Sequence, residues 1–544
     1  MKNIILLFLI VLFGCKTNKV FKPIILNKDI DTLLVNHKVN KNFKNWEFKD
    51  VVLDSVVGIS LYRAYDSILN NKDSKSVVVA LIDMTVEVNH LGLKKSIWVN
   101  SKEKVNGIDD DNNGYVDDIR GWNYIGNNKG QNNEFVNYEY TRILKKYLPN
   151  FKDSIIVHKS LTDSLEYAIY IKALEKYNKR LEYAKNEVDY INMVSKSKSD
   201  AEKLISNFIK TNLTIEILDS LKGVYPKDAK LQKAIKRKSN FIKYGYSDEF
   251  VKDYKLKAKE RINKLLNLYY NDRIIQEDNS GVINNICYGS YMFNTNTTLL
   301  DHGTKMAGII KKVGFKNEIQ IMPLTISSYG DEHDKDIALA IRYAVDNGAK
   351  VINMSFAKEF STNLNWVLEA IKYADKKNVL IVSAASNDGI NLDKLINRKF
   401  PNDHSLKNNI EVSNNFLTVG SSNYKFGKSL KSSFSNYGNN EVDVFAPGQQ
   451  IYTTFPKNKF DMSYGGTSSA TALTSGVAAL LFSYYPKLSA SEIKDILMNS
   501  GLEFSIKVKT PIKTDNMLET PFNQLSKSGK IINAYNAIVS AEKK

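Results

Sequence analysis

The sequence has little of what would assign it to several common classes of protein. It has only two cysteines, Cys15 and Cys287, in 544 residues, so no framework of disulfides is expected. After the first residues, no apolar run is long enough to cross a membrane. Acidic residues are fewer than basic ones, 59 against 76, which gives a formal charge of +17. The lysines are scattered rather than gathered in one arginine-rich block. We therefore expect no nucleic-acid partner, and only a mild attraction to anionic surfaces or acidic substrates.

The first residues have the pattern of an export signal. Lys2 precedes an apolar run over residues 4–13, which is too short to span a membrane and is typical of a cleavable signal peptide. The run ends in "LFGC", which resembles the lipobox of bacterial lipoproteins. This resemblance implies a signal peptide over 1–14, a lipid anchor at Cys15 and a tether over 15–44. The chain would then be an exported lipoprotein of the cell envelope, on the periplasmic side or the surface of the outer membrane. An ordinary signal peptide with a chance cysteine is the alternative.

Four apolar runs rich in β-branched residues predict buried strands of a parallel sheet. They are "SVVVALID", "IQIMPLTI", "AKVINMSF" and "NVLIVSAAS", at residues 76–83, 319–326, 349–356 and 378–386. Helical stretches at 334–348 and 363–378 separate them. This alternation predicts an α/β domain with a mostly parallel central sheet flanked by helices. We expect the domain in two parts, residues 45–128 and 273–544.

The segment between these parts, residues 129–272, has a different pattern. Its strand signals vanish, and lysine, glutamate, tyrosine and leucine dominate. From Tyr167 to Ile191, apolar residues recur at alternating steps of three and four, as in a coiled coil. The segment therefore predicts an all-helical insertion whose helices fold back on one another and interrupt the α/β domain.

The stretch "GGTSSATALTSGVAALL" at residues 465–481 places Ser468 at the start of a predicted buried helix. A helix cap is one interpretation, because serine favours helix N-termini. A nucleophile is the other, because a helix N-terminus stabilises nearby negative charge. The serine can also serve both roles.

Three further residues lie where an α/β enzyme places its chemistry. Asp83 ends the strand 76–83, and sites in open α/β sheets gather at the carboxyl ends of strands. His302, in "DHGTKMAGII", is a candidate general base at the start of a helix. Asn387 follows the strand 378–386, where its amide can donate to an oxyanion. Taken singly, each has a structural alternative: a cap, a buried histidine and a turn residue.

Asp83, His302, Asn387 and Ser468 together, in this order, resemble the subtilisin-like serine proteases, or subtilases. The resemblance extends over residues 45–124 and 273–541, including "KVINMSFA", "FSNYGNNEVDVFAPG" and "YYPKLSASEIKDIL". It implies the subtilisin-like fold and a serine endopeptidase. Ser468 would be the nucleophile and His302 the general base. Asp83 would orient the imidazole, and Asn387 would hold the oxyanion with the Ser468 amide.

Five positions beside these residues depart from the usual pattern of the family. Met84 and Thr85 replace a (Ser/Thr)-Gly pair, Ser386 replaces a glycine, and Ser469 and Ala472 replace a methionine and a proline. None of these changes removes a catalytic group, but a misplacement of about 1 Å costs on the order of a hundredfold in rate. The alternative hypothesis is a catalytically impaired lipoprotein that binds peptides or envelope proteins.

Subtilases bind the substrate backbone as an added strand. The resemblance places the two substrate-binding edges at Ser355, Phe356 and Ala357, and at Ser383, Ala384, Ala385 and Ser386. Family members often have glycine where this chain has Ala357 and Lys358, so the first specificity pocket is expected to be narrow. The alternative is that these residues only pack nearby.

The loop "NGIDDDNNGYVDDIRGWNY" predicts a structural calcium ion. Its ligands would be Asp109, Asp111, Asn113, the carbonyl of Tyr115, and Asp117 or its neighbour Asp118. The twelfth position is Arg120 rather than glutamate, so the loop is not an EF-hand. A solvated acidic turn is the alternative, and the chemistry itself requires no cofactor.

The helical insertion separates Asp83 from His302 by 219 residues, although both belong in one cleft. The inserted chain must therefore leave the sheet and return close to where it left. We expect it near the rim of the active site, where it gates the entry of substrates. A docking arm for another envelope protein is the alternative.

Overall fold

The computed structural model describes residues 21–26, 44–151, 161–284, 286, 288–293, 296, 299–316, 318–405, 408–511 and 517–544. The predicted signal peptide, Cys15, most of the predicted tether and Cys287 lie outside the described residues. None of the helices in the described ranges has the length and apolar character needed to cross a membrane.

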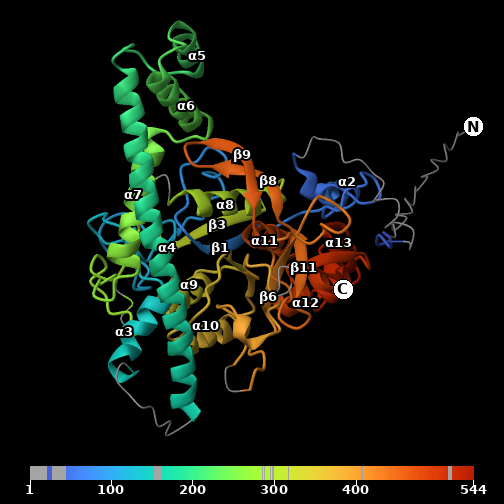
Figure 1. The fold of residues 1–544 in the computed structure, drawn as a ribbon. Helices are drawn as coiled ribbons and strands as arrows, with labels where there is room; N and C mark the ends of the chain where they lie inside the picture. The colour runs from blue at the N-terminus through green and yellow to red at the C-terminus, as the bar shows by residue number, and fades with distance from the viewer. Residues whose placement is uncertain are drawn as a thin grey trace, which may run out of the picture.

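A nine-stranded sheet forms the centre of the molecule, in the order β10-β13-β7-β6-β5-β4-β1-β3-β2 (Figure 1). All neighbouring strands are parallel except β10 and β13. The strands are β1 (Val77–Asp83), β2 (Trp122–Asn123), β3 (Ile319–Thr325), β4 (Val351–Met354), β5 (Leu380–Ala384), β6 (Phe416–Ser422), β7 (Val444–Pro447), β10 (Leu502–Glu503) and β13 (Lys530–Ile531). The four predicted runs form β1, β3, β4 and β5, so the α/β prediction is confirmed.

Two antiparallel hairpins and several short helices accompany the sheet. The hairpins pair β8 (Gln449–Phe455) with β9 (Lys459–Gly465), and β11 (Lys507–Pro511) with β12 (Met517–Pro521). The short helices are η1 (Trp46–Phe48), α2 (Leu61–Ser67), η2 (Leu69–Asn71), η4 (Leu395–Asn397) and η5 (Phe522–Gln524).

Helices cover both faces of the sheet. One face packs against α8 (Asp301–Val313), α11 (Thr467–Tyr484), α12 (Ala490–Asn499) and α13 (Ala534–Ala541), and the other against α9 (Asp334–Asp346) and α10 (Leu364–Lys376). Successive side chains of β1 therefore enter different cores: Val79 and Leu81 face the first group, and Ala80 and Ile82 the second. Because β3 and β4 lie on opposite sides of β1, the carboxyl end of β1 is a topological switch point.

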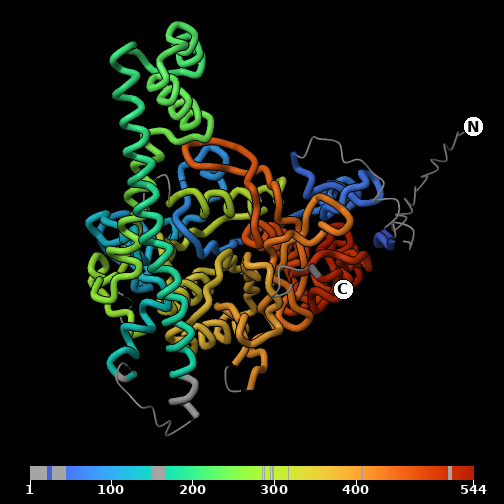
Figure 2. Tube along the Cα trace, in the orientation of Figure 1, coloured from blue at the N-terminus to red at the C-terminus, as the bar shows by residue number. Residues whose placement is uncertain are grey.

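Helices occupy most of the stretch between β2 and β3. They are α3 (Glu139–Phe151), α4 (Leu161–Ile205), α5 (Ile215–Val224), α6 (Ala229–Lys243), α7 (Asp248–Glu260) and η3 (Arg261–Leu265). The 45 residues of α4 span about 68 Å. The apolar stripe from Tyr167 to Ile191 lies on α4 and packs against α3 and α7. At one end of α4, α5 and α6 stand clear of the α/β body (Figures 1 and 2).

Candidate active site

Asp83 and His302 meet at the carboxyl end of β1. Oδ1 of the buried Asp83 lies 2.6 Å from Nδ1 of His302, and the Met84 amide donates to the same oxygen at 2.7 Å. Because a carboxylate only accepts hydrogen bonds, Nδ1 carries the proton and Nε2 is left as an acceptor. A Cβ at Gly303 would lie 2.2 Å from the Met84 carbonyl. Glycine at this position therefore lets α8 begin directly against the chain that follows Asp83.

The surroundings of His302 favour its protonated form. Burial disfavours the charged imidazole, but the Asp83 carboxylate outweighs burial, so the pKa of His302 lies above its ordinary value. The side chain is 35% exposed, which leaves it able to exchange a proton with a group in the cleft. These are the properties of a general base held in one tautomer.

Ser468 is the second residue of α11 and the one residue of that helix that is not buried. The N-cap is Gly466, and no side chain caps the helix, so the interpretation of Ser468 as a cap is wrong. Gly465 has a φ of 99°, and a Cβ there would lie 2.1 Å from the Gly448 carbonyl. Glycine therefore permits the turn that exposes the serine at the helix start.

The Ser468 hydroxyl is hydrogen-bonded to a residue of the predicted substrate edge. It donates to the Ser355 carbonyl at 2.8 Å, and Ser355 Oγ donates back to the Ser468 carbonyl at 3.0 Å. Within the described part of the chain, no hydrogen bond joins Ser468 to His302. Contact between this hydroxyl and the imidazole therefore requires the hydroxyl to leave Ser355. Such contacts are often long in enzymes without substrate.

Asn387 lies beside the start of α11. Its Oδ1 accepts hydrogen bonds from the amide and the hydroxyl of Thr467, at 2.9 and 3.1 Å, so Nδ2 is the end left to donate. A Cβ at Gly466 would lie 3.6 Å from Asn387 Nδ2 and 3.7 Å from the Ser468 amide nitrogen. The position that a Cβ of residue 466 would occupy is thus close to both donors, and the glycine leaves this position empty.

The loop around Asn387 contains one residue in a strained backbone conformation and is hydrogen-bonded by Asn436. Ser386 has a φ of 76°, a conformation that favours glycine, which explains the usual glycine of the family at this position. Asn436, which is buried, donates to the Ala385 carbonyl at 2.8 Å and accepts from the Asp388 amide at 3.1 Å. Asn436 lies within the stretch "FSNYGNNEVDVFAPG", but no local pattern in that stretch predicted this positioning role.

The seven predicted substrate-binding residues differ in exposure. Phe356, Ala357 and Ser386 are partly exposed. The buried members are Ser355, Ser383, Ala384 and Ala385. Ser383 and Ala384 are part of β5, which already pairs with β6. The accessible part of the predicted edges is therefore Phe356 and Ala357 on one side and Ser386 on the other.

The chain that continues from Ala357 is anchored in the helical insertion. The buried Lys358 Nζ lies 3.4 Å from a carboxylate oxygen of Glu139 in α3. Glu359 lies 3.0 Å from Lys176 of α4, and Phe360 is buried in an apolar cluster between α3 and α4. Three consecutive residues after the predicted substrate edge thus contact the insertion.

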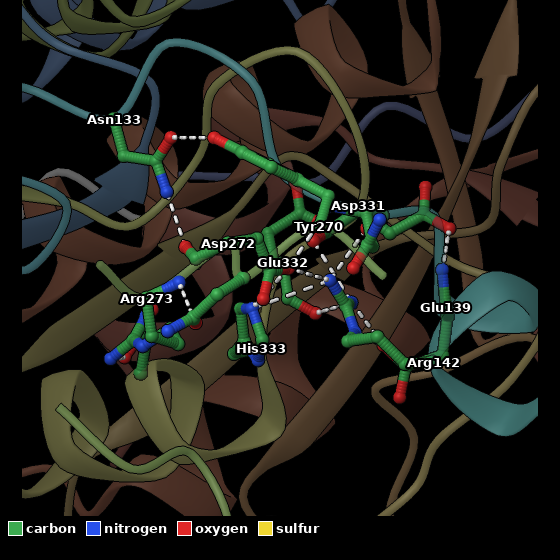
Figure 3. Close-up of polar contacts among 12 residues, drawn as sticks. Asn133, Glu139, Arg142, Tyr270, Asp272, Arg273, Asp331, Glu332 and His333 are labelled. Carbon is green, nitrogen blue, oxygen red and sulfur yellow. Dashed lines mark hydrogen bonds and ion pairs between the residues drawn. The ribbon is translucent and has the colours of Figure 1, made fainter. Parts of the chain in front are cut away.

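A buried network of charged residues joins the insertion to the α/β domain (Figure 3). Arg142 pairs with Glu139 and donates to the carbonyls of Asp331 and Glu332, each at 3.0 Å. Asp272 Oδ2 lies 3.0 Å from Nε2 of His333. We call Glu139, Arg142, Asp272, His333 and Lys358 the base network.

The base network fixes the protonation of its members. Burial opposes the charge of Glu139, but Arg142 and Lys358 outweigh it and lower the pKa to about 2. Burial and the nearby Arg142 lower the pKa of His333, despite the opposing effect of Asp272. The network therefore keeps Glu139 ionised and disfavours the protonated form of His333.

The acidic loop gathers one group of carboxylates. Ligand atoms of Glu103, Asp109 and Asp111 lie within 4.8 Å of one another. Glu103 Oε2 is buried without a hydrogen-bond partner among the described residues, and burial raises the pKa of this side chain. Glu103 precedes the motif by six residues, and the motif did not reveal it.

Asp109, Asn113 and Asp117 also accept hydrogen bonds from backbone amides of the loop. Asp109 accepts from the amides of Asn113 and Gly114, at 3.1 and 2.8 Å, and Asn113 Oδ1 accepts from the Tyr115 amide at 2.8 Å. Asp117 Oδ1 instead accepts from the Asn106 and Gly107 amides, at 2.8 and 2.9 Å. Asp117 thus closes the neighbouring turn, outside the carboxylate group.

A parallel α/β sheet with an aspartate and a histidine bonded at its switch point, together with an accessible serine at a helix start, defines a subtilisin-like serine peptidase architecture. The model of the subtilase family, Peptidase_S8, matches residues 74–524. The chain therefore belongs to the subtilase family.

The sequence is also similar to several proteins whose names identify them as proteases. The chain is 29% identical over 387 residues to the "Cell wall-associated protease" of Bacillus subtilis, covering 61% of this chain and 40% of the relative. It is 30% identical over 267 residues to "Subtilisin-like protease 1" of Plasmodium falciparum, covering 44% of this chain and 37% of the relative. With "Thermitase" of Thermoactinomyces vulgaris it shares 32% identity over 213 residues, covering 38% and 68%. The chain spans about two fifths of the length of the first two relatives.

Proposed function

We propose that this chain is a serine endopeptidase that hydrolyses peptide bonds through Ser468, His302, Asp83 and Asn387. The observation that supports it most is the 2.6 Å contact between Asp83 and His302, which leaves Nε2 of the imidazole as a base. Ser468 attacks the peptide carbonyl while His302 takes its proton and later gives it to the leaving amine. Asp83 holds the tautomer and stabilises the imidazolium.

The oxyanion is held at the point beside Gly466. Asn387 Nδ2 and the Ser468 amide nitrogen lie 3.6 and 3.7 Å from this point, and the Thr467 amide keeps the side chain of Asn387 oriented. The substrate is a peptide or protein whose backbone adds as a strand along Phe356, Ala357 and Ser386.

A fluorophosphonate probe and a peptide substrate test this proposal. Ser468→Ala is expected to abolish both labelling and cleavage, whereas the matched control Ser469→Ala keeps both. Asn387→Leu is expected to lower kcat by roughly a hundred- to a thousandfold while the Ser468 hydroxyl stays present. Unchanged kinetics of Asn387→Leu would overturn the oxyanion assignment, and folded wild-type protein without labelling would overturn the peptidase proposal.

A second candidate is a catalytically impaired protein that binds peptides or envelope proteins in the same cleft. The contact of the Ser468 hydroxyl with the Ser355 carbonyl favours it, because the hydroxyl is engaged away from His302. Binding of a peptide that is recovered uncleaved, with no probe labelling, distinguishes it from the enzyme.

We further propose that Cys15 is lipidated and that the protein is an exported lipoprotein of the cell envelope, at the outer membrane. The "LFGC" stretch supports this anchor, and the name of the Bacillus relative is consistent with an envelope location. Cys15→Ala is expected to move the protein from the detergent phase to the aqueous phase, because acyl chains supply the membrane affinity. Detergent-phase recovery of the variant would contradict the anchor.

A structural calcium ion in the acidic loop is part of the proposal. Glu103, Asp109 and Asp111 supply the carboxylates, with Asn113 and the Tyr115 carbonyl beside them, and such oxygen donors suit this hard cation. The partnerless oxygen of Glu103 fits the role. Calcium is expected to raise Tm, and Glu103→Gln to weaken that increase, whereas Asp301→Asn serves as a control outside the loop.

A further inference from the structure

The end of the insertion that stands clear of the body has an unusual surface. We call residues 206–246 the insertion tip; it contains α5 and α6 (Figure 1). Leu231, Ala234 and Ile235 of α6 are buried in an apolar cluster with Ala201 and Ile205 of α4. The remaining face of α6 is therefore turned away from the molecule and is available to a partner.

The insertion tip concentrates positive charge. It holds nine lysine and arginine residues against three acidic residues, so 41 residues supply six of the chain's seventeen net positive charges. Within the described part of the chain, Lys238 is the one cation of the tip that forms an ion pair, with Glu202. The other cations are exposed: Lys210, Lys222, Lys227, Lys230, Lys233, Lys236, Arg237 and Lys243.

The neighbouring helix α7 provides an internal comparison. Helix α6 has six basic residues and no acidic one. Helix α7, of similar length, has four lysines and four acidic residues, and Lys257 pairs with Asp253. A general excess of lysine in the chain would raise the charge of both helices, so the imbalance of α6 is a local feature.

Exposed apolar and aromatic side chains lie among these cations. Val224 and Tyr244 are 65% and 67% exposed, and Phe208, Tyr225 and Ile242 are also exposed. Tyrosine at the junction of a basic and an apolar surface is typical of protein that rests in a lipid headgroup layer. A solvated helix face has no need of these side chains.

We propose that the insertion tip docks on an anionic lipid surface. Its unpaired cations meet lipid phosphates, and Val224, Tyr225 and Tyr244 enter the layer between headgroups and acyl chains. A nucleic acid offers phosphates but no such apolar layer, and an acidic protein would have to match the shape of the tip. The proposal is independent of catalysis and of the anchor at Cys15.

The test uses the full chain with Cys15→Ala, so that no acyl chain contributes to binding. Sedimentation with phosphatidylcholine vesicles that contain phosphatidylglycerol is compared with sedimentation on phosphatidylcholine alone. The tip variant carries Lys230→Gln, Lys233→Gln and Arg237→Gln. The matched control carries Lys252→Gln, Lys255→Gln and Lys259→Gln, which have the same spacing on α7.

We expect binding to the anionic vesicles and little to the neutral ones. Each cation near the surface contributes roughly fivefold, so the tip variant is expected to bind about a hundredfold more weakly. The α7 control is expected to bind as the parent does, and Tyr244→Ser to bind more weakly at unchanged charge. Equal binding of the tip variant and its parent would overturn the proposal. So would equal loss in both triple variants, or binding to an acidic protein or a nucleic acid without binding to the vesicles.

Discussion

The two ends of the helical insertion hold their charges in opposite ways. At the base network, Glu139 and Lys358 are buried, the Arg142 side chain is only 9% exposed, and Glu139 pairs with both cations. At the insertion tip, eight cations are exposed and form no ion pair within the described residues. A buried charge that loses its partner is costly, whereas an exposed charge contributes little to stability. The paired charges of the base therefore fix the geometry there, whereas the unpaired cations of the tip remain available to a partner.

The position of the base network changes how the insertion relates to the cleft. Lys358 follows the predicted substrate edge directly, and its ammonium lies among carboxylates supplied by the insertion and by α9. The insertion thus anchors the chain that follows the predicted substrate edge, and its gating of substrates stays a prediction. Removing the insertion would therefore disturb this chain.

The largest expected difference between base and tip appears on deletion. Replacing residues 129–272 by a linker removes Asp272, the partner of His333, and Glu139, one of the two carboxylates beside Lys358, and we expect insoluble or unfolded protein. Replacing only 206–246 leaves the base network whole. We expect that protein to fold and to keep its fluorophosphonate labelling, because Lys198 and Asp248 already bring the two cut ends together. Soluble, active protein from the longer deletion would show that the base is not structural.

A single arginine at each end sharpens the comparison. Arg142→Met removes a nearly buried cation from Glu139 and Asp272, which keep only Lys358 and His333 as partners, and this is expected to cost about 3 kcal/mol of unfolding free energy. Arg237→Met at the exposed tip is expected to change it by about 0.5 kcal/mol or less. Urea unfolding measures both, and equal effects would contradict the distinction.

Two phenylalanines extend the comparison to apolar packing. Phe360 is 4% exposed in the cluster between α3 and α4, and Phe208 of the tip is 37% exposed. Phe360→Ala is expected to cost about 3 kcal/mol and to raise KM for peptides, because the chain after Ala357 loses its anchor. Phe208→Ala is expected to cost clearly less and to leave KM unchanged. An unchanged KM in folded Phe360→Ala protein would mean that the cleft wall does not depend on this anchor.

The sequence predicted those parts of the fold and site that short segments determine. The β-branched runs predicted β1 and its neighbours, and with them the place of Asp83 at the switch point. The motifs pointed to His302, Asn387 and Ser468, whose catalytic roles stay predictions, although the structure excludes the cap role of Ser468. The acidic motif did not reveal Glu103, because its carboxylate joins the group only through the fold of the loop.

Contacts between distant segments were beyond such reasoning. Glu139 and Lys358 have ordinary neighbours in the sequence and meet only because α3 packs against the chain after β4. Asn436 holds the loop of Asn387 from a separate segment, and no spacing rule connects the two. Residues that position others through tertiary contacts leave no local pattern to detect.

The smallest expected effect is a contribution to the pH dependence of stability that the base has and the tip lacks. The pKa of His333 is lowered in the folded state by burial and by Arg142, and Asp272 opposes this, so the unfolded chain binds its proton more readily. Stability is then fully present above the unfolded pKa of about 6.5 and falls as pH drops through the range down to the folded pKa. One such group changes the unfolding free energy by at most about 1.4 kcal/mol per pH unit.

His333→Gln is expected to flatten this slope in urea unfolding between neutral and mildly acidic pH. The tip has no histidine, so the triple glutamine variant of α6 is expected to keep the slope of the parent. A slope that survives His333→Gln unchanged would assign the pH dependence to other groups.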